Sequence, residues 1–213
     1  MNCDKRAMLL YAVTDRTWLN GRRLEDDVEA ALRGGATMLQ LREKDLPYED
    51  YLAEARGIKA LCAQYHVPFV IDDDVEVALA CGADGIHVGQ SDMAAGDVRR
   101  RVGESMLLGV SAQTVEQALA AERAGADYLG VGAAFPTSTK LDADVVSRET
   151  LTAICQAVHI PVCAIGGVSR DNLLELSGAG VDGVSVISAI FAAGDIEGAC
   201  RELLALSTEM VAK

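Results

Sequence analysis

The stretch ALACGADGIHVGQ at 78–90 contains the pattern that decides the fold. A helix-like segment ends at a Gly-Ala pair, an acidic residue follows, and a short apolar run comes next. Three other stretches have a similar order, ALRGGATMLQLRE at 31–43, AERAGADYLGVGA at 121–133 and ELSGAGVDGVSVIS at 175–188. The glycine suits a left-handed helix C-cap, which alanine would adopt only with strain. The apolar run after it is typical of a strand buried on both faces of a parallel sheet.

The same rhythm extends along the whole chain. Helical patterns occupy 24–35, 48–66, 114–126 and 147–158, and strand-like runs lie between such patterns. The predicted strands are 8–14, 37–42, 68–72, 84–88, 106–111, 127–132, 161–165 and 183–187. Eight alternating strand–helix units predict an α/β fold, a closed (β/α)8 TIM barrel that forms one domain over 1–213. An open flavodoxin-like sheet is the alternative, but it would leave about three strands unused.

Composition and charge narrow the classes of function. The 213 residues are 50% hydrophobic and only 4% aromatic, which is ample for one aliphatic core. A formal net charge of −13 argues against nucleic acid as a partner, because nucleic-acid-binding surfaces are basic. No apolar run approaches the roughly 18–20 residues that span a bilayer. Six cysteines without a C-x-x-C pair indicate reduced, buried thiols, and with no signal-peptide pattern we expect a cytoplasmic protein.

In such a barrel, functional residues belong at the carboxyl ends of the strands. Gln40, Arg42 and Lys44 alternate after the second strand, so their side chains share one side of an extended segment and suit an anion. Gly167 follows the seventh strand in a Gly-Gly pair that leads into the expected seventh helix, where bare N–H groups can meet a phosphate. Other polar or strand-end residues expected at this anion-binding mouth are Thr137, Ser138, Thr139, Lys140, Ile187 and Ser188.

Three consecutive aspartates, Asp72, Asp73 and Asp74, end the third predicted strand, and Asp92 follows the fourth. Two carboxylates from neighbouring loops are the usual protein share of a Mg²⁺ site, so Asp73 and Asp92 are the predicted magnesium ligands. The alternative for each aspartate is a helix N-cap. Asp74 is expected to face solvent or to cap the next helix.

The three histidines are expected to have structural roles. His66 and His159 stand where a helix gives way to a strand, at the opposite end of the barrel, and we expect structural roles for them. His87 lies inside the fourth strand and is interpreted as a packed core histidine. No Ser-His-Asp arrangement and no general base is evident. Two anion-binding ends therefore suggest a diphosphate and a monophosphate, and a reaction driven by departure of diphosphate.

Seven motifs, in order, resemble the thiamine-phosphate synthase family over essentially the whole chain. They are YAVTD, QLREK, DDxVEVALACGADGIHVGQSD, GVSAQT, FPTSTK, AIGGV and GVSVISAI. The resemblance implies a (β/α)8 barrel that joins a hydroxymethylpyrimidine diphosphate to a thiazole phosphate with Mg²⁺, and releases diphosphate and thiamine phosphate. It also implies a dissociative reaction, in which a pyrimidine-stabilised methylene cation is trapped by the thiazole nitrogen. The implied partners are these small molecules, and the sequence is compatible with a homo-oligomer.

The resemblance also assigns residues. Those implied to contact the pyrimidine diphosphate are Gln40, Leu41, Arg42, Glu43, Lys44, Asp72, Ser111 and Lys140, of which Arg42, Lys44, Ser111 and Lys140 are the expected catalytic groups. Thr137, Ser138, Thr139, Gly167, Ile187 and Ser188 would hold the thiazole phosphate. The family commonly has Asn-Asp-Arg at 72–74, so Asp72 replaces an amide near the diphosphate and Asp74 replaces a cation.

Three alternatives share parts of this pattern. A thiazole tautomerase-like relative would have no need of the intact QLREK and paired aspartates. A sugar-phosphate epimerase or an indole-forming synthase would require acid and base residues that the strand ends lack. A module that senses thiamine intermediates without turnover is poorly separated from the synthase by sequence.

Overall fold

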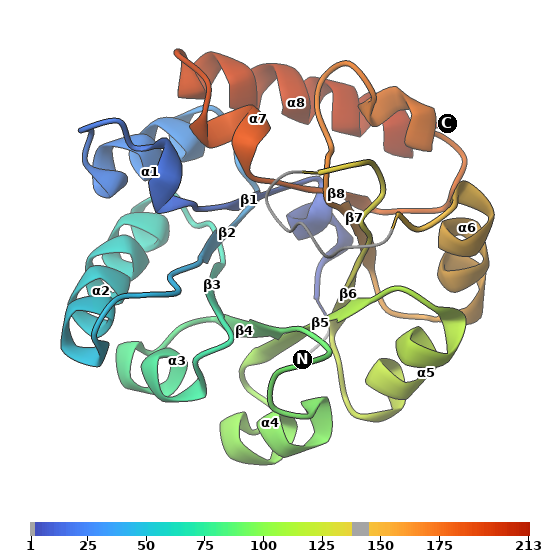
Figure 1. Ribbon diagram of the computed structural model, residues 1–213, viewed down its shortest axis with the longest axis horizontal. Helices are drawn as coiled ribbons and strands as arrows, with labels where there is room; N and C mark the ends of the chain where they lie inside the picture. The colour runs from blue at the N-terminus through green and yellow to red at the C-terminus, as the bar shows by residue number, and fades with distance from the viewer. Residues whose placement is uncertain (1–2, 138–144) are drawn as a thin grey trace.

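Eight parallel strands close into a barrel in the order β1 to β8, each paired with its neighbours in sequence and β8 paired with β1 (Figure 1). This computed structural model describes residues 3–137 and 145–213. The strands are β1 Leu10–Val13, β2 Met38–Leu41, β3 Phe69–Asp72, β4 Gly85–Val88, β5 Leu107–Ala112, β6 Tyr128–Val131, β7 Val162–Ile165 and β8 Gly183–Val186. All eight predicted strands, and the closed barrel, are therefore confirmed.

Helices surround the barrel as an outer ring (Figure 1). The α-helices are α1 Leu24–Arg33, α2 Tyr48–Gln64, α3 Val75–Cys81, α4 Ala95–Val102, α5 Val115–Arg123, α6 Arg148–Ala157, α7 Ser188–Phe191 and α8 Ile196–Val211. Short 3₁₀ helices are η1 Lys5–Met8, η2 Arg16–Trp18 and η3 Leu173–Leu176. The prediction of an α-helix directly after the Gly-Gly pair is wrong. The connection from β7 to β8 is fully described, and its only helical element is the 3₁₀ helix η3.

The repeated sequence pattern has a common structural meaning. Gly35, Gly82, Gly125 and Gly180 all have positive φ, between 67° and 98°, and each ends a helical or turn segment before a strand. Two residues later comes Thr37, Asp84, Asp127 or Asp182. Each of these four side chains accepts a hydrogen bond from the N–H of a residue at the start of the preceding strand, at 2.8–3.0 Å; the donors are Leu10, Phe69, Leu108 and Val162.

The backbone completes the pairing. The N–H of each of the same four residues donates to the carbonyl of its partner at 2.7–2.9 Å, so both backbone groups of the partner are satisfied. The barrel is thus joined at its amino-terminal end by four equivalent clamps, which link β1 to β2, β3 to β4, β5 to β6 and β7 to β8. The acidic residue in the repeat is a structural acceptor, because its carboxylate binds a backbone N–H at the start of a strand that would otherwise have no partner.

Alternating residues of the strands face two separate cores. Leu10 and Ala12 of β1 pack with the helix-facing cluster, which also contains the buried faces of α1, α2 and α8. Tyr11 and Val13 belong to a second cluster with Met38, Val70, Leu107, Tyr128 and Cys163, one or more from most strands. Because strand side chains alternate in direction, this second cluster fills the interior of the barrel.

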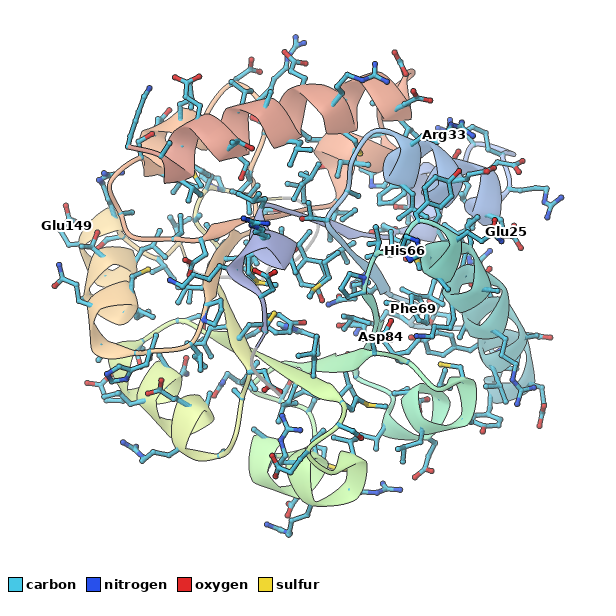
Figure 2. The ribbon with its side chains drawn as sticks, turned by 180° about the vertical axis from the view of Figure 1, so that it is seen from behind. Glu25, Arg33, His66, Phe69, Asp84 and Glu149 are labelled. Atoms are coloured by element: carbon cyan, nitrogen blue, oxygen red, sulfur yellow. The ribbon has the colours of Figure 1, made fainter. Side chains whose placement is uncertain are left out.

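The N-terminal segment closes the end opposite the site. Seen from behind, η1 lies across the centre of the barrel (Figure 2). Its Ala7 carbonyl accepts from the hydroxyl of Thr37, and Met8 is fully buried in the interior cluster. Among the described residues, no helix has the length and apolar character needed to cross a membrane.

Candidate active site

A pocket of about 610 Å³ opens at the carboxyl ends of the strands. Residues from every strand or from the loop after it contribute to its wall. Of the residues expected from sequence, those that line it are Gln40, Arg42, Lys44, Asp72, Asp73, Asp92, Ser111, Thr137, Gly167, Ile187 and Ser188. The barrel therefore gathers into one cavity a set that spans almost 150 positions of the sequence.

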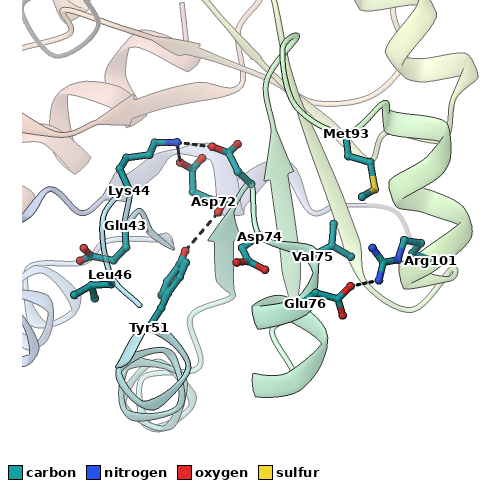
Figure 3. Close-up of a pocket in the computed structure, with 11 residues that line it drawn as sticks. Glu43, Lys44, Leu46, Tyr51, Asp72, Asp74, Val75, Glu76, Met93 and Arg101 are labelled. Atoms are coloured by element: carbon teal, nitrogen blue, oxygen red, sulfur yellow. Dashed lines mark hydrogen bonds and ion pairs between the residues drawn. The ribbon is translucent and has the colours of Figure 1, made fainter. Parts of the chain in front are cut away.

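Cations and carboxylates meet where β2 and β3 end, and Figure 3 shows Lys44 against Asp72. The Lys44 ammonium lies 3.0 Å from a carboxylate oxygen of Asp72 and also binds Asp73. Arg42 extends between Asp72 at 3.8 Å and Asp15 at 3.6 Å. Burial alone would lower the pKa of Lys44, but the carboxylates of Asp73 and Asp72 raise it above its ordinary value, so the ammonium stays charged. The unusual carboxylate at Asp72 is thus offset by two cations.

The three adjacent aspartates have three different environments. Asp72 is buried at the end of β3, and its carbonyl accepts from the Tyr51 hydroxyl at 3.4 Å. Asp73 has a left-handed backbone, φ 60°, which turns its carboxylate towards the pocket and Lys44. Asp74 caps α3, where its carboxylate accepts from the N–H of Val77 at 2.9 Å, as the sequence predicted.

Asp73 and Asp92 approach each other from neighbouring strand ends. Asp92 accepts from the N–H of Gly89 at 2.7 Å, which fixes its loop after β4. Burial, and then the hydrogen bond to the Asp73 carboxyl, raise the pKa of Asp92. Two oxygen ligands whose negative charges repel each other fit a divalent cation, whose charge would offset that repulsion. In the described part of the chain, no group of three His, Cys, Asp or Glu side chains converges here, so further ligands would have to come from water or substrate.

The opposite wall of the pocket is made of backbone. Gly166 and Gly167 have φ of 82° and 68°, and a Cβ on Gly167 would lie 2.5 Å from the Pro136 carbonyl oxygen. Glycine is therefore required by both conformation and space. The helix start that lines the pocket with them is that of α7, whose first residue is Ser188 and which follows β8; it takes the place of the predicted seventh helix. The first N–H groups of a helix have no partner within it, so they are available to an anion.

A buried hydrogen-bonded chain lies under the pocket, and sequence reasoning missed it. Gln40 Nε2 donates to the Tyr11 hydroxyl at 2.7 Å, which lies 2.8 Å from the Tyr128 hydroxyl. Tyr128 lies 3.2 Å from Nδ1 of His87, and His87 Nε2 lies 2.9 Å from the Ser111 hydroxyl. The interpretation of His87 as a core histidine is right about its burial but incomplete, because the ring also borders the pocket and contacts a site residue.

Some predicted residues lie elsewhere. The side chain of Leu41 is fully buried between strand and helix, so only its backbone faces this region. Glu43 accepts from Arg16 at 3.1 Å and borders a neighbouring pocket of about 450 Å³, lined also by Tyr51, Glu76, Met93 and Arg101 (Figure 3). Ser138, Thr139 and Lys140 lie outside the described residues. His66 and His159 follow α2 and α6 at the far end of the barrel, as expected.

Comparisons with known proteins agree with this geometry. A family model described as thiamine monophosphate synthase matches residues 10–190. The chain is 48% identical over 200 residues to the thiamine-phosphate synthase of Clostridium tetani, covering 94% of this chain and 96% of that one. It is 47% identical to that of Ruminiclostridium cellulolyticum, covering 92% and 93%. Its fold matches a thiamine phosphate pyrophosphorylase structure from Pyrococcus furiosus with a TM-score of 0.90 and 39% identity, over 97% of this chain and 98% of that one.

Proposed function

Because the chain belongs to the thiamine monophosphate synthase family, we propose that its pocket joins 4-amino-2-methyl-5-hydroxymethylpyrimidine diphosphate to 4-methyl-5-hydroxyethylthiazole phosphate. The products are thiamine phosphate and diphosphate, so the enzyme is a transferase of thiamine biosynthesis. The observation that carries this assignment is a single cavity with Arg42 and Lys44 on one wall and the Gly167 and Ser188 backbone on the other. Two anions of different size can then bind side by side.

The first wall suits the leaving diphosphate. Arg42 and Lys44 would neutralise its charge together with Lys140, while Gln40 and Ser111 would hold the pyrimidine diphosphate. Asp73 and Asp92 would hold Mg²⁺, which supplies charge neutralisation to the diphosphate oxygens when bound. The side-chain contacts of Lys44 with Asp72 and Asp73 would then be exchanged for contacts with the diphosphate.

The second wall suits the thiazole phosphate. N–H groups near Gly167 and Ser188, with the hydroxyls of 137–139, would fix its phosphate and so aim the ring nitrogen at the pyrimidine methylene. The C–O bond of the diphosphate ester breaks with its electrons leaving on diphosphate, and the nitrogen lone pair forms the new C–N bond. That nitrogen carries no proton, which explains why the site needs no general base. Alignment and charge stabilisation are then the main contributions of the protein.

The deciding experiment follows diphosphate release from both substrates, with Mg²⁺ and after its removal by a chelator. We expect release that requires Mg²⁺ and both substrates. Binding of the phosphates without any release would favour a sensor, and conversion of a thiazole isomer without diphosphate chemistry would favour a tautomerase. As a control, Asp195→Asn changes the N-cap of α8, which does not line the pocket, and should leave the rate unchanged.

A further inference from the structure

The hydrogen-bonded chain under the pocket connects two residues of the site through three buried rings. Its members are Gln40, Tyr11, Tyr128, His87 and Ser111, which come from β2, β1, β6, β4 and β5 in turn. Gln40 and Ser111 line the pocket, and Tyr11 and Tyr128 are almost completely buried. Ser111 and Gln40 are thus linked beneath the pocket by a path made of side chains alone.

The barrel makes room for these rings. A Cβ on Gly109 would lie 2.1 Å from the Tyr128 ring and 2.5 Å from His87 Nδ1, and a Cβ on Gly130 would lie 3.2 Å from His87 Cε1. Tyr128 packs edge-on against Tyr11 with ring centroids 5.8 Å apart. Any larger residue at these two strand positions would displace the rings, so glycine is needed for this arrangement of hydroxyl groups.

With the Gln40 amide nitrogen facing Tyr11, as it does in the structure, the donors run in one direction along the chain. Gln40 donates its amide N–H to Tyr11, so the single hydroxyl proton of Tyr11 goes to Tyr128. Tyr128 then donates to His87 Nδ1, which leaves the one proton of a neutral imidazole on Nε2. His87 Nε2–H donates to the Ser111 oxygen, and the hydroxyl proton of Ser111 is left for the pocket.

The protonation states are those that such a chain requires. Burial raises the pKa of both Tyr11 and Tyr128 well above the ordinary value, so both phenols keep their protons. Burial lowers the pKa of His87 to about 4, so its ring is neutral at pH 7. The carbonyl of Ser111 also accepts from Gln90 at 2.7 Å, which fixes the backbone from which its hydroxyl projects.

We propose that Tyr11, Tyr128 and His87 are positioning residues that determine which groups of the site donate hydrogen bonds and which accept them. They hold Ser111 as a hydrogen-bond donor, and Gln40 as a carbonyl acceptor, toward the pyrimidine diphosphate. The substrate's identity rests on the proposed function, but the direction of the chain does not. The chain would favour a ligand with an acceptor at Ser111 and a donor, such as an exocyclic amine, at Gln40.

The direct test is the tautomer of His87, read by ¹⁵N NMR of protein labelled at its three histidines. We expect wild-type His87 to be protonated on Nε2, and Tyr128→Phe to show a mixture of tautomers because Nδ1 loses its donor. Tyr65→Phe is the matched control, since its hydroxyl binds Glu29 on the outside of the barrel. Protonation on Nδ1 in the wild type, or an unchanged Nε2 tautomer in Tyr128→Phe, would overturn the proposal. This measurement needs no turnover, so it stays decisive if the proposed reaction is wrong.

A kinetic test separates positioning from general damage. Tyr128→Phe should lower kcat/KM for the pyrimidine diphosphate about tenfold and leave KM for the thiazole phosphate unchanged. His87→Gln places an amide N–H near the position of Nε2 and should retain more activity than His87→Asn, which is too short to reach Ser111. Equal activity of the two His87 variants, or equal shifts in both KM values, would contradict the assigned role.

Discussion

At the residue scale, Asp72 sets the charge of the diphosphate end. Its carboxylate takes up part of the positive charge of Lys44 at 3.0 Å and of Arg42 at 3.8 Å. Asp72→Asn should free both cations for the substrate and lower KM for the pyrimidine diphosphate about fivefold, the equivalent of about 1 kcal/mol. Steady-state kinetics at low and high salt would measure this effect.

The matched control for that change is Asp171→Asn, which removes the charge of a highly exposed carboxylate that pairs with its neighbour Arg170. We expect no change in KM for this variant. A KM for Asp72→Asn equal to or above that of the wild type would mean that Asp72 holds Lys44 in its binding position instead of competing with the substrate.

Two aspartates from neighbouring strand ends should differ in what their loss affects, which is activity for Asp92 and stability for Asp74. Asp92→Ala should abolish Mg²⁺-dependent diphosphate release, because it removes one of the two proposed ligands. Asp74→Ala should keep the activity and lower the free energy of unfolding by about 1 kcal/mol, because it removes the cap of α3. Enzyme assays and urea unfolding of both variants test the assignment, and a larger loss of activity in Asp74→Ala would reverse it.

At the scale of elements, the four amino-terminal clamps differ in burial, so their loss should differ in cost. The side chain of Asp127 is 9% exposed and also binds Arg99 at 2.5 Å. Asp127→Ala would leave the Arg99 guanidinium and the Leu108 N–H without this partner, and should cost about 3 kcal/mol. Asp84 is 41% exposed, so Asp84→Ala should cost only about 1 kcal/mol. Urea denaturation compares the two, and equal losses would mean that burial does not set the strength of the clamp.

The elements that could be predicted from sequence are those with a local signature. The glycines before β2, β4, β6 and β8, together with the short apolar runs of all eight strands, located every strand within a few residues. The segment after β7 misled the prediction because Gly166 and Gly167 resemble a helix entry, whereas their contacts with 133–136 are tertiary. The buried chain had no local signature, because Tyr11 and Tyr128 are 117 positions apart and meet only inside the closed barrel.

At the scale of the whole molecule, the residues that stabilise the barrel and the residues of the site lie at opposite ends of its axis. The clamps and η1 occupy the amino-terminal end, whereas the charged residues and bare backbone occupy the carboxyl end. His87 connects the barrel interior with the pocket, since its ring packs with Tyr128 in the interior and its Nε2 reaches Ser111 at the pocket. A change in the charge of this ring should therefore affect the stability of the entire barrel.

The pH dependence of unfolding tests that connection. Burial lowers the pKa of His87 from 6.5 to about 4, so between these pH values the unfolded chain binds a proton that the folded chain excludes. The free energy of unfolding should therefore fall as the pH drops from 6.5 to 4, with His87 contributing about 3 kcal/mol of that loss. His87→Gln cannot titrate, and the carboxylates titrate in both proteins, so the difference between them isolates the imidazole. Urea unfolding at pH 7.5 and 4.5 should show the smaller loss in His87→Gln, and equal losses would mean that the buried ring is protonated as readily as in the unfolded chain.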